Sequence, residues 1–76
     1  MFEDSIKNNI VLNQPFEEEK FTKVLKQAAL FDWIDTLEDK EDHELVQNGS
    51  NVSGGQRQRI SIARELYAAY DIIFID

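Results

Sequence analysis

Apolar side chains recur at helical spacing in the first half of the chain, and this predicts a helix from about residue 16 to residue 30. The three glutamates at 17–19 would lie in its first turn, where the helix dipole favours negative charge. Pro15 suits the same first turn, because its missing amide is not needed there. The positions that define the buried stripe are Phe21, Val24, Leu25, Ala28 and Ala29.

Two shorter helical segments flank this one. Ile6 and Ile10 mark the first, for which Asp4 or Ser5 can act as the N-terminal cap. The second is a short apolar helix or turn over residues 31–37. The aromatic side chains of Phe21, Phe31 and Trp33 could form a ligand platform, but packing in the core explains them better.

The best-marked helix follows a polar, turn-rich loop over residues 38–51. Ser53 and Gln56 have the spacing of a capping box, in which each residue hydrogen-bonds the backbone amide of the other. The apolar stripe of this helix consists of Ile60, Ala63, Leu66 and Tyr67.

The chain closes on a continuous β-prone run, Ile72 to Ile75, followed by Asp76. Such a run is typical of a strand buried on both faces of a parallel sheet. The sequence therefore predicts a mainly α chain of three to four helices plus one C-terminal strand over residues 71–76. The rest of the chain offers no strands for it to pair with.

The charge of the chain is acidic and uneven. The 76 residues carry a net charge of −7, with twelve acidic residues against five lysines in 1–51 and three against three arginines in 52–76. This argues against nucleic-acid binding, which needs a basic surface. Absence of cysteine excludes a disulfide scaffold. His43, in the acidic loop, is interpreted as a surface residue.

The start of the helix after Ser53 is the strongest candidate for chemistry. Gly54 and Gly55 have no side chains and lie where the first amides of a helix are free to donate. A helix N-terminus of this kind can bind a phosphate. Ser53 adds a hydroxyl. An ordinary capped helix after a glycine turn is the alternative explanation of these residues alone.

The longer string around this start resembles the signature motif of ATP-binding-cassette (ABC) ATPases, usually read L-S-G-G-Q. The matching residues are Val52-Ser53-Gly54-Gly55-Gln56-Arg57-Gln58-Arg59-Ile60-Ser61-Ile62-Ala63-Arg64. The terminal run is similar to the family's Walker B strand, with Asp76 as its aspartate. The segment Phe2 to Ile10 and the Gly49-Ser50-Asn51-Val52 string are similar to exporter-type domains.

The resemblance implies a fragment of an exporter-type nucleotide-binding domain, itself an α/β P-loop NTPase domain. Residues 1–51 would be helical subdomain and loop, 52–70 the signature motif and helix, and 71–76 the Walker B strand. Ser53, Gly54, Gly55 and Gln56 would contact ATP bound by a second nucleotide-binding domain, and Asp76 would help to hold Mg²⁺. The other partners would be transmembrane domains, on the cytoplasmic side of a membrane.

The sequence departs from the family pattern at two positions and lacks two of the family's motifs. Val52 stands where leucine is common, and Gln47 where exporters often carry a glutamate that contacts the transmembrane domains. The sequence contains no Gly-x-x-x-x-Gly-Lys-Ser/Thr phosphate loop. The family's catalytic glutamate would follow Asp76, so no catalytic residue lies in the chain and the isolated chain is expected to be inactive.

Two other functions remain open at this point. One is an ABC-type ATPase that acts on DNA or ribosomes rather than in transport, since it would share the signature. The other is an acidic helical interaction module with no nucleotide role. Membrane-spanning segments upstream in the same gene would separate the transporter from both.

Overall fold

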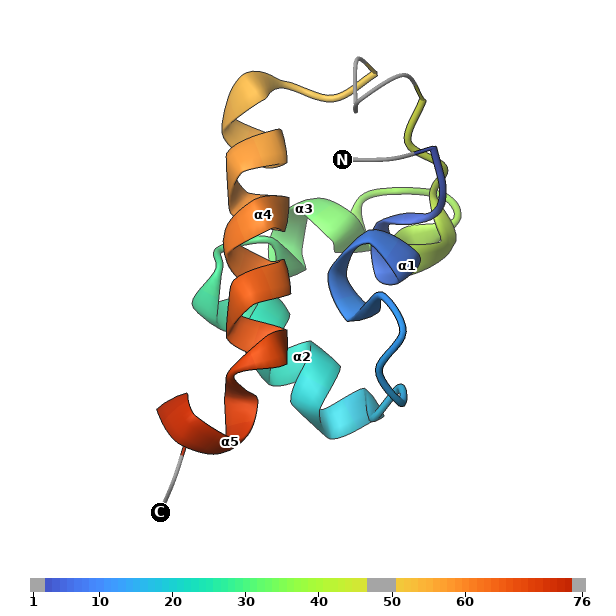
Figure 1. Cartoon of the computed structure of the whole chain (residues 1–76). Helices are drawn as coiled ribbons and strands as arrows, with labels where there is room; N and C mark the ends of the chain where they lie inside the picture. The colour runs from blue at the N-terminus through green and yellow to red at the C-terminus, as the bar shows by residue number, and fades with distance from the viewer. Residues whose placement is uncertain (1–2, 47–50, 75–76) are drawn as a thin grey trace.

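Helices make up nearly all of the regular structure in the computed structural model, which describes residues 3–46 and 51–74 (Figure 1). The mainly helical class expected from the sequence is confirmed. In chain order the elements are α1 (Ile6–Val11), α2 (Glu18–Gln27), α3 (Phe31–Asp35), the 3₁₀ turn η1 (Lys40–Asp42), α4 (Gly54–Ala68) and α5 (Tyr70–Ile73).

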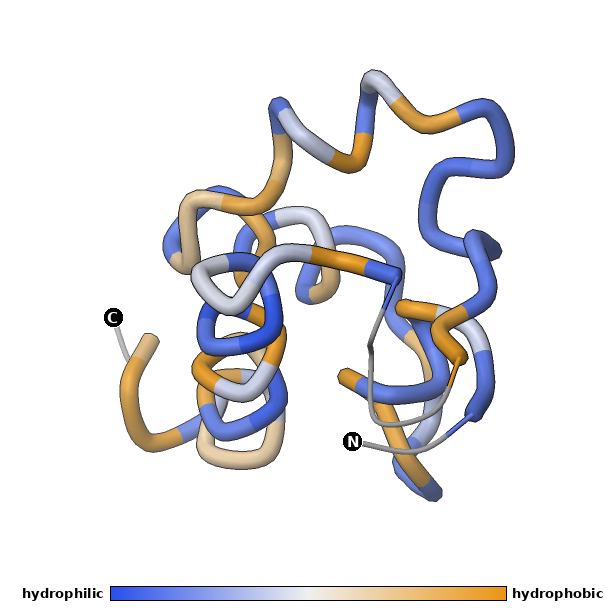
Figure 2. The backbone as a smooth tube through the Cα atoms, turned by 90° about the horizontal axis from the view of Figure 1, so that it is seen from above, coloured by the Kyte–Doolittle hydropathy of each residue, from blue (hydrophilic) through white to orange (hydrophobic). Residues whose placement is uncertain are grey.

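The longest helix, α4, contacts both α1 and α2 along one of its sides (Figure 1). Ile60, Ala63 and Tyr67 lie on this side, and all three are fully buried. Figure 2 looks down α4 and shows hydrophobic and hydrophilic stretches alternating around its coil. Burial of one large apolar side chain contributes about 1.5–3 kcal/mol, so this face of α4 is a main source of stability.

Residues from α1, α2, α3 and α4 meet in one core, together with residues from the connecting segments. Phe21, Val24, Leu25 and Ala28 are buried as the helical spacing predicts, whereas Ala29 is exposed. Phe31 and Trp33 are partly buried against the core, which agrees with a packing role. Among the described residues, the buried apolar side chains are Ile6, Ile10, Val11, Phe21, Val24, Leu25, Ala28, Leu30, Ile34, Leu45, Ile60, Ala63 and Tyr67.

Ser5 is the N-terminal cap of α1, because its hydroxyl accepts a hydrogen bond from the Asn8 amide at 3.0 Å. Asp4 supports the cap: its carboxylate accepts from the Ser5 amide at 2.7 Å and from the Asn8 side chain at 2.9 Å. An antiparallel bridge between Ser5 and Glu44 then ties the start of α1 to the segment after η1. Two distant parts of the chain are thereby joined.

The segment just before α2 is hydrogen-bonded to Tyr67 of α4, and Pro15 lies outside the first turn of α2. α2 begins at Glu18, so the prediction that Pro15 lies in its first turn is wrong. The Tyr67 hydroxyl donates to the Pro15 carbonyl at 2.6 Å and accepts from the Glu17 amide at 3.1 Å. A buried tyrosine hydroxyl needs such partners, and here they position the connection between α1 and α2.

The end of α2 comes earlier than the predicted residue 30. Ala29 has φ 59°, in the left-handed region, and this ends the helix. The Leu30 amide donates to the Leu25 carbonyl at 2.8 Å, the hydrogen bond that characterises a Schellman helix end. The reversal turns Leu30 into the core, where it is fully buried.

The C-terminal strand predicted for residues 71–76 is wrong for the described residues of that segment, since Tyr70–Ile73 form α5. A strand satisfies its backbone only by pairing with a neighbour, and the described part of the chain contains no strand beside it. A helix satisfies its backbone locally. The Phe74 ring lies 4.7 Å from the Tyr70 ring and 5.1 Å from the Lys23 ammonium, which holds this end against α2.

Within residues 3–46 and 51–74, no helix is both long enough and apolar enough to cross a membrane.

Candidate functional site

The predicted capping box is present at the start of α4. Ser53 has extended backbone dihedral angles, φ −67° and ψ 159°, and precedes the first helical residue. Its hydroxyl accepts from the Gln56 amide at 3.1 Å, and the Gln56 side chain accepts from the Ser53 amide at 3.2 Å. The two reciprocal bonds hold the first turn of α4 in a defined orientation.

Gly54 and Gly55 are the first two residues of α4, and both are exposed. Their amides belong to the first turn, where no carbonyl of the same helix can accept from them. A Cβ added at Gly54 would come no closer than 3.7 Å to the Arg57 side chain, and one at Gly55 no closer than 3.8 Å to Arg59. These are ordinary contacts, so the packing of this chain does not require glycine at either position.

Two guanidinium groups flank the helix start. Arg57 donates to the Val52 carbonyl at 3.4 Å, and the side chains of Arg57 and Arg59 lie next to the two glycines. Their positive charge adds to that of the helix N-terminus. The site is thus electropositive in a chain with a net charge of −7, and an anion is the ligand it suits best.

Asn51 holds the chain just before the helix start. Its side-chain oxygen accepts from the Val46 amide at 3.1 Å, and its side-chain nitrogen donates to the Glu44 carbonyl at 2.9 Å. The same nitrogen lies 3.5 Å from Nε2 of His43, which is half-buried. Asn51 therefore joins the segment after η1 to the residues just before Ser53.

Two residues singled out from the sequence lie outside the described residues: Asp76, the predicted magnesium ligand, and Gln47, predicted in the loop toward the transmembrane domains. The described residues contain no group of three or more His, Asp or Glu side chains that could hold a metal ion. The site described here thus consists of Ser53, Gly54, Gly55 and Gln56 with the two flanking arginines.

A connection that sequence reasoning missed joins α4 to α1. Arg64 Nε donates to the Asn9 carbonyl at 2.7 Å, and its terminal nitrogen lies 3.3 Å from Asn9 Oδ1. Asn9 is fully buried, and its side-chain nitrogen also donates to the Ser5 carbonyl at 3.0 Å. The sequence shows that Arg64 lies off the apolar stripe of its helix. That position does not identify its hydrogen-bond partner, which is 55 residues away.

The sequence matches the family described as ABC transporter over residues 2–76. The human protein "ATP-binding cassette sub-family C member 8" is 36% identical over 72 residues. "ABC transporter C family member 3" of Dictyostelium discoideum and "Multidrug resistance protein fer6" of Mycosarcoma maydis are each 39% identical over the same length. In each case the match covers 95% of this chain and 5% of the relative.

The fold has a solved counterpart in "Structure of a bacterial Atm1-family ABC exporter with ATP bound". The TM-score is 0.81 at 34% sequence identity, over 88% of this chain and 12% of that one. The helical fold and these similarities together define part of an ABC exporter nucleotide-binding domain. The chain belongs to the ABC transporter family.

Proposed function

We propose that this chain is the part of an ABC exporter's ATPase domain that presents the start of α4 to ATP held by a second nucleotide-binding domain. The observation that supports this most directly is the open space around Gly54 and Gly55. Gly54 and Gly55 are the first two residues of α4, and a Cβ would fit at either position. Two glycines that internal packing does not require are explained by a ligand that must approach the backbone closely.

The residues at this helix start have separate roles in the proposed contact. The amides of Gly54 and Gly55 donate to the terminal phosphate, and the helix dipole adds favourable charge. Ser53 supplies a hydroxyl donor, while Gln56 keeps that hydroxyl in place through the capping box. Arg57 and Arg59 raise the local positive potential around the phosphate.

The remaining parts of the proposal concern the intact transporter. Asp76 would contribute to binding Mg²⁺, which neutralises phosphate charge during phosphoryl transfer. Closure of the two nucleotide-binding domains on ATP would move transmembrane domains between access states from the cytoplasmic side of the membrane. The sequence lacks a phosphate loop, so the isolated chain is expected to show no ATP hydrolysis.

The substitution Gly54→Asp in the intact transporter tests the proposal. The new carboxylate would stand where a phosphate must approach, and like charges about 4 Å apart repel by ~1–4 kcal/mol. ATP turnover is expected to fall by about tenfold or more, while ATP affinity in the non-hydrolysing state stays close to wild type. Ser61→Asp is the matched control, because Ser61 is exposed on the same helix but lies beyond its first turn.

Two results would contradict the proposal. If Gly54→Asp hydrolysed ATP at the wild-type rate, the start of α4 would not contact the ATP phosphates. A large loss of initial ATP binding would show that Gly54 contacts nucleotide within its own domain, rather than across an interface. Transport by reconstituted vesicles, measured on the same variants, separates an exporter from an ABC-type ATPase without a transport role.

A further inference from the structure

The start of α4 lies well away from the part of that helix that packs in the core. Ile60 is the first fully buried residue of α4, six positions after Gly54. With a rise of about 1.5 Å per residue, these two residues are about 9 Å apart along the helix axis. Ser53, Gly54 and Gly55 are all exposed. The position of the helix start therefore depends on the residues that lead into it.

Asn51, two residues before the cap, fixes this entry to the helix through its side-chain amide. The amide oxygen accepts from the Val46 backbone amide at 3.1 Å, and the amide nitrogen donates to the Glu44 carbonyl at 2.9 Å. Because one group is both donor and acceptor here, the pair of bonds sets orientation as well as distance. Val52 is half-buried against the core, but an apolar contact of this kind is non-directional.

The two backbone groups that Asn51 binds belong to a segment held against α1. The Ile6 amide donates to the His43 carbonyl at 3.0 Å, and the Leu45 amide donates to the Asp4 carbonyl at 2.8 Å. Leu45 is 1% exposed and belongs to the core. Asn51 therefore binds backbone whose own position is fixed by hydrogen bonds and by burial.

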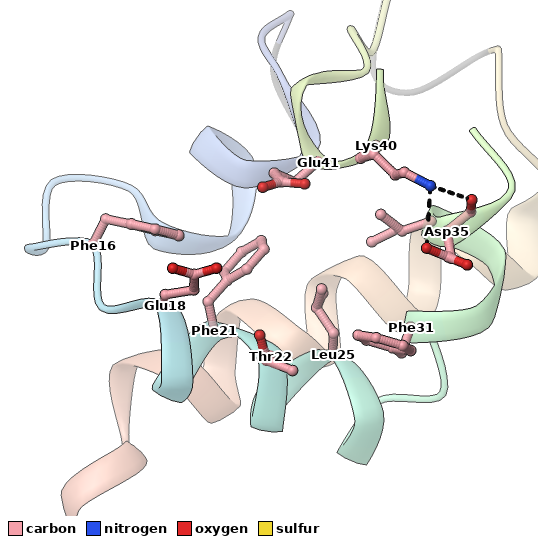
Figure 3. A pocket seen from close by; sticks show the side chains of 10 residues that line it. Phe16, Glu18, Phe21, Thr22, Leu25, Phe31, Asp35, Lys40 and Glu41 are labelled. Carbon is pink, nitrogen blue, oxygen red and sulfur yellow. Dashed lines mark hydrogen bonds and ion pairs between the residues drawn. The ribbon is translucent and has the colours of Figure 1, made fainter. Parts of the chain in front are cut away.

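The η1 turn, which precedes this segment, is fixed as well. Lys40 of η1 donates to the Asp35 carbonyl at 2.7 Å, and its ammonium lies 3.1 Å from the Asp35 carboxylate, as the dashed lines in Figure 3 show. The same turn contacts α1. The partners of Asn51 thus follow a turn that two helices hold in place.

We propose that Asn51 is a positioning residue for the phosphate contact at the start of α4, an inference that rests on the proposed function. Asn51 acts through its neighbours: it holds Ser53 and the amides of Gly54 and Gly55 at a set distance from the segment fixed against α1. Precision of this kind matters, because a misplacement of ~1 Å can lower a rate by about 10²-fold.

The substitution Asn51→Ala in the intact transporter removes both hydrogen bonds. We expect kcat for ATP hydrolysis to fall by about tenfold or more. KM for ATP should stay within about twofold of wild type, because the proposed contact forms after ATP has bound to the other domain. Thr36→Val is the matched control, because the exposed Thr36 hydroxyl donates to the Trp33 carbonyl at 2.6 Å, at the end of α3. It also loses a side-chain bond to the backbone, and it should keep the wild-type kcat.

Nuclear magnetic relaxation of the labelled chain separates positioning from loss of the fold. In Asn51→Ala the order parameters of the Gly54 and Gly55 amides should fall from about 0.85, typical of rigid backbone, to below about 0.6. Those of Ile60 and Tyr67 should stay as in wild type. Asn51→Gln keeps the amide group on a longer stem, so it should restore part of the lost order and, in the transporter, part of the lost kcat.

Three results would overturn the inference. The first is a wild-type kcat in Asn51→Ala while Gly54→Asp loses turnover, which would leave the proposed nucleotide contact intact and remove the role of Asn51. The second is an equal loss of kcat in Asn51→Ala and Thr36→Val. The third is unchanged order at Gly54 and Gly55 in Asn51→Ala. Wild-type turnover in both Asn51→Ala and Gly54→Asp would instead contradict the proposed function itself, and this inference with it.

Discussion

The Ser53 hydroxyl accepts a hydrogen bond from the Gln56 amide at 3.1 Å, so Ser53→Ala removes one half of the capping box. We expect the free energy of unfolding of the chain to fall by about 1 kcal/mol, the usual cost of a lost N-terminal cap. Urea denaturation followed by circular dichroism measures this, and Ser61→Ala, inside the same helix, should change stability little. An unchanged unfolding midpoint in Ser53→Ala would show that the cap is dispensable.

Ser53→Asp separates the cap from the proposed ligand contact, since aspartate is also a good cap. The chain should keep its stability, while the intact transporter loses ATP turnover because a carboxylate faces the phosphate. Loss of both properties together would mean that Ser53 acts only through the fold.

Asp4 is the residue at which pH should affect stability. Hydrogen bonds from the Asn8 side chain and the Ser5 amide lower the pKa of the Asp4 carboxyl below its usual value. A carboxyl with a lower pKa in the folded state stabilises the fold above its unfolded pKa, and this contribution disappears as pH falls through the folded pKa. Unfolding free energy should therefore decrease below about pH 4.

Asp4→Asn should remove part of this acid sensitivity. The control is Asp39→Asn, because Asp39 precedes η1 without a capping hydrogen bond from its side chain. Denaturation curves at a series of acidic pH values would compare the two variants. The same pH dependence in Asp4→Asn as in wild type would exclude Asp4 as its source.

The contact between α1 and α4 depends on polar as well as apolar groups. Arg64 donates to the Asn9 carbonyl at 2.7 Å, beside the fully buried side chain of Asn9. We expect Arg64→Met, which keeps the length but not the donors, to lower the free energy of unfolding by about 1–3 kcal/mol. Arg59→Met is the control, because Arg59 is exposed on the same helix.

Hydrogen exchange would show which helices are destabilised by Arg64→Met. Amides of α1 should lose protection more than amides of α2, because Arg64 hydrogen-bonds α1. Uniform loss across both helices would instead indicate general destabilisation of the core.

Comparison of the predicted and observed helices shows which parts of the fold can be predicted from the sequence. The capping box of α4 and the buried faces of α2 and α4 were predicted, since both depend on residues a few positions apart. The end of α2 was not, because it depends on Ala29 with φ 59°, a conformation that alanine rarely adopts. The tie between Tyr67 and Pro15 was also missed, since it joins residues 52 positions apart.

The α5 segment shows the limit of local preference. Ile72 and Ile73 are β-branched and favour strands, yet they are helical here. Strand preference becomes stable structure only beside a pairing neighbour, and the described residues supply none. At the candidate site the capping box of Ser53 and Gln56 was predictable from the spacing of these residues, whereas the open space around Gly54 and Gly55 required coordinates.

At the scale of the whole molecule, the two most exposed large apolar side chains of the described residues lie outside the acidic part of the chain. The acidic excess lies within residues 1–51, and the charges of residues 52–76 balance. Ile72 is 77% exposed and Ile73 49% exposed, both in the balanced part. Because charge repulsion is weakest there, α5 is the surface at which association of the chain with itself is most favourable.

We therefore expect the chain to self-associate in a concentration-dependent manner, and Ile72→Lys with Ile73→Lys to reduce this. The two lysines lower the net negative charge, a change that alone would favour association, so a reduction would report loss of the apolar surface. Val46→Lys is the control, since Val46 is 45% exposed but lies far along the chain from α5. Sedimentation velocity over a concentration series measures the effect; a wild-type chain that stays monomeric, or a double variant that associates equally, would exclude α5 as the contact.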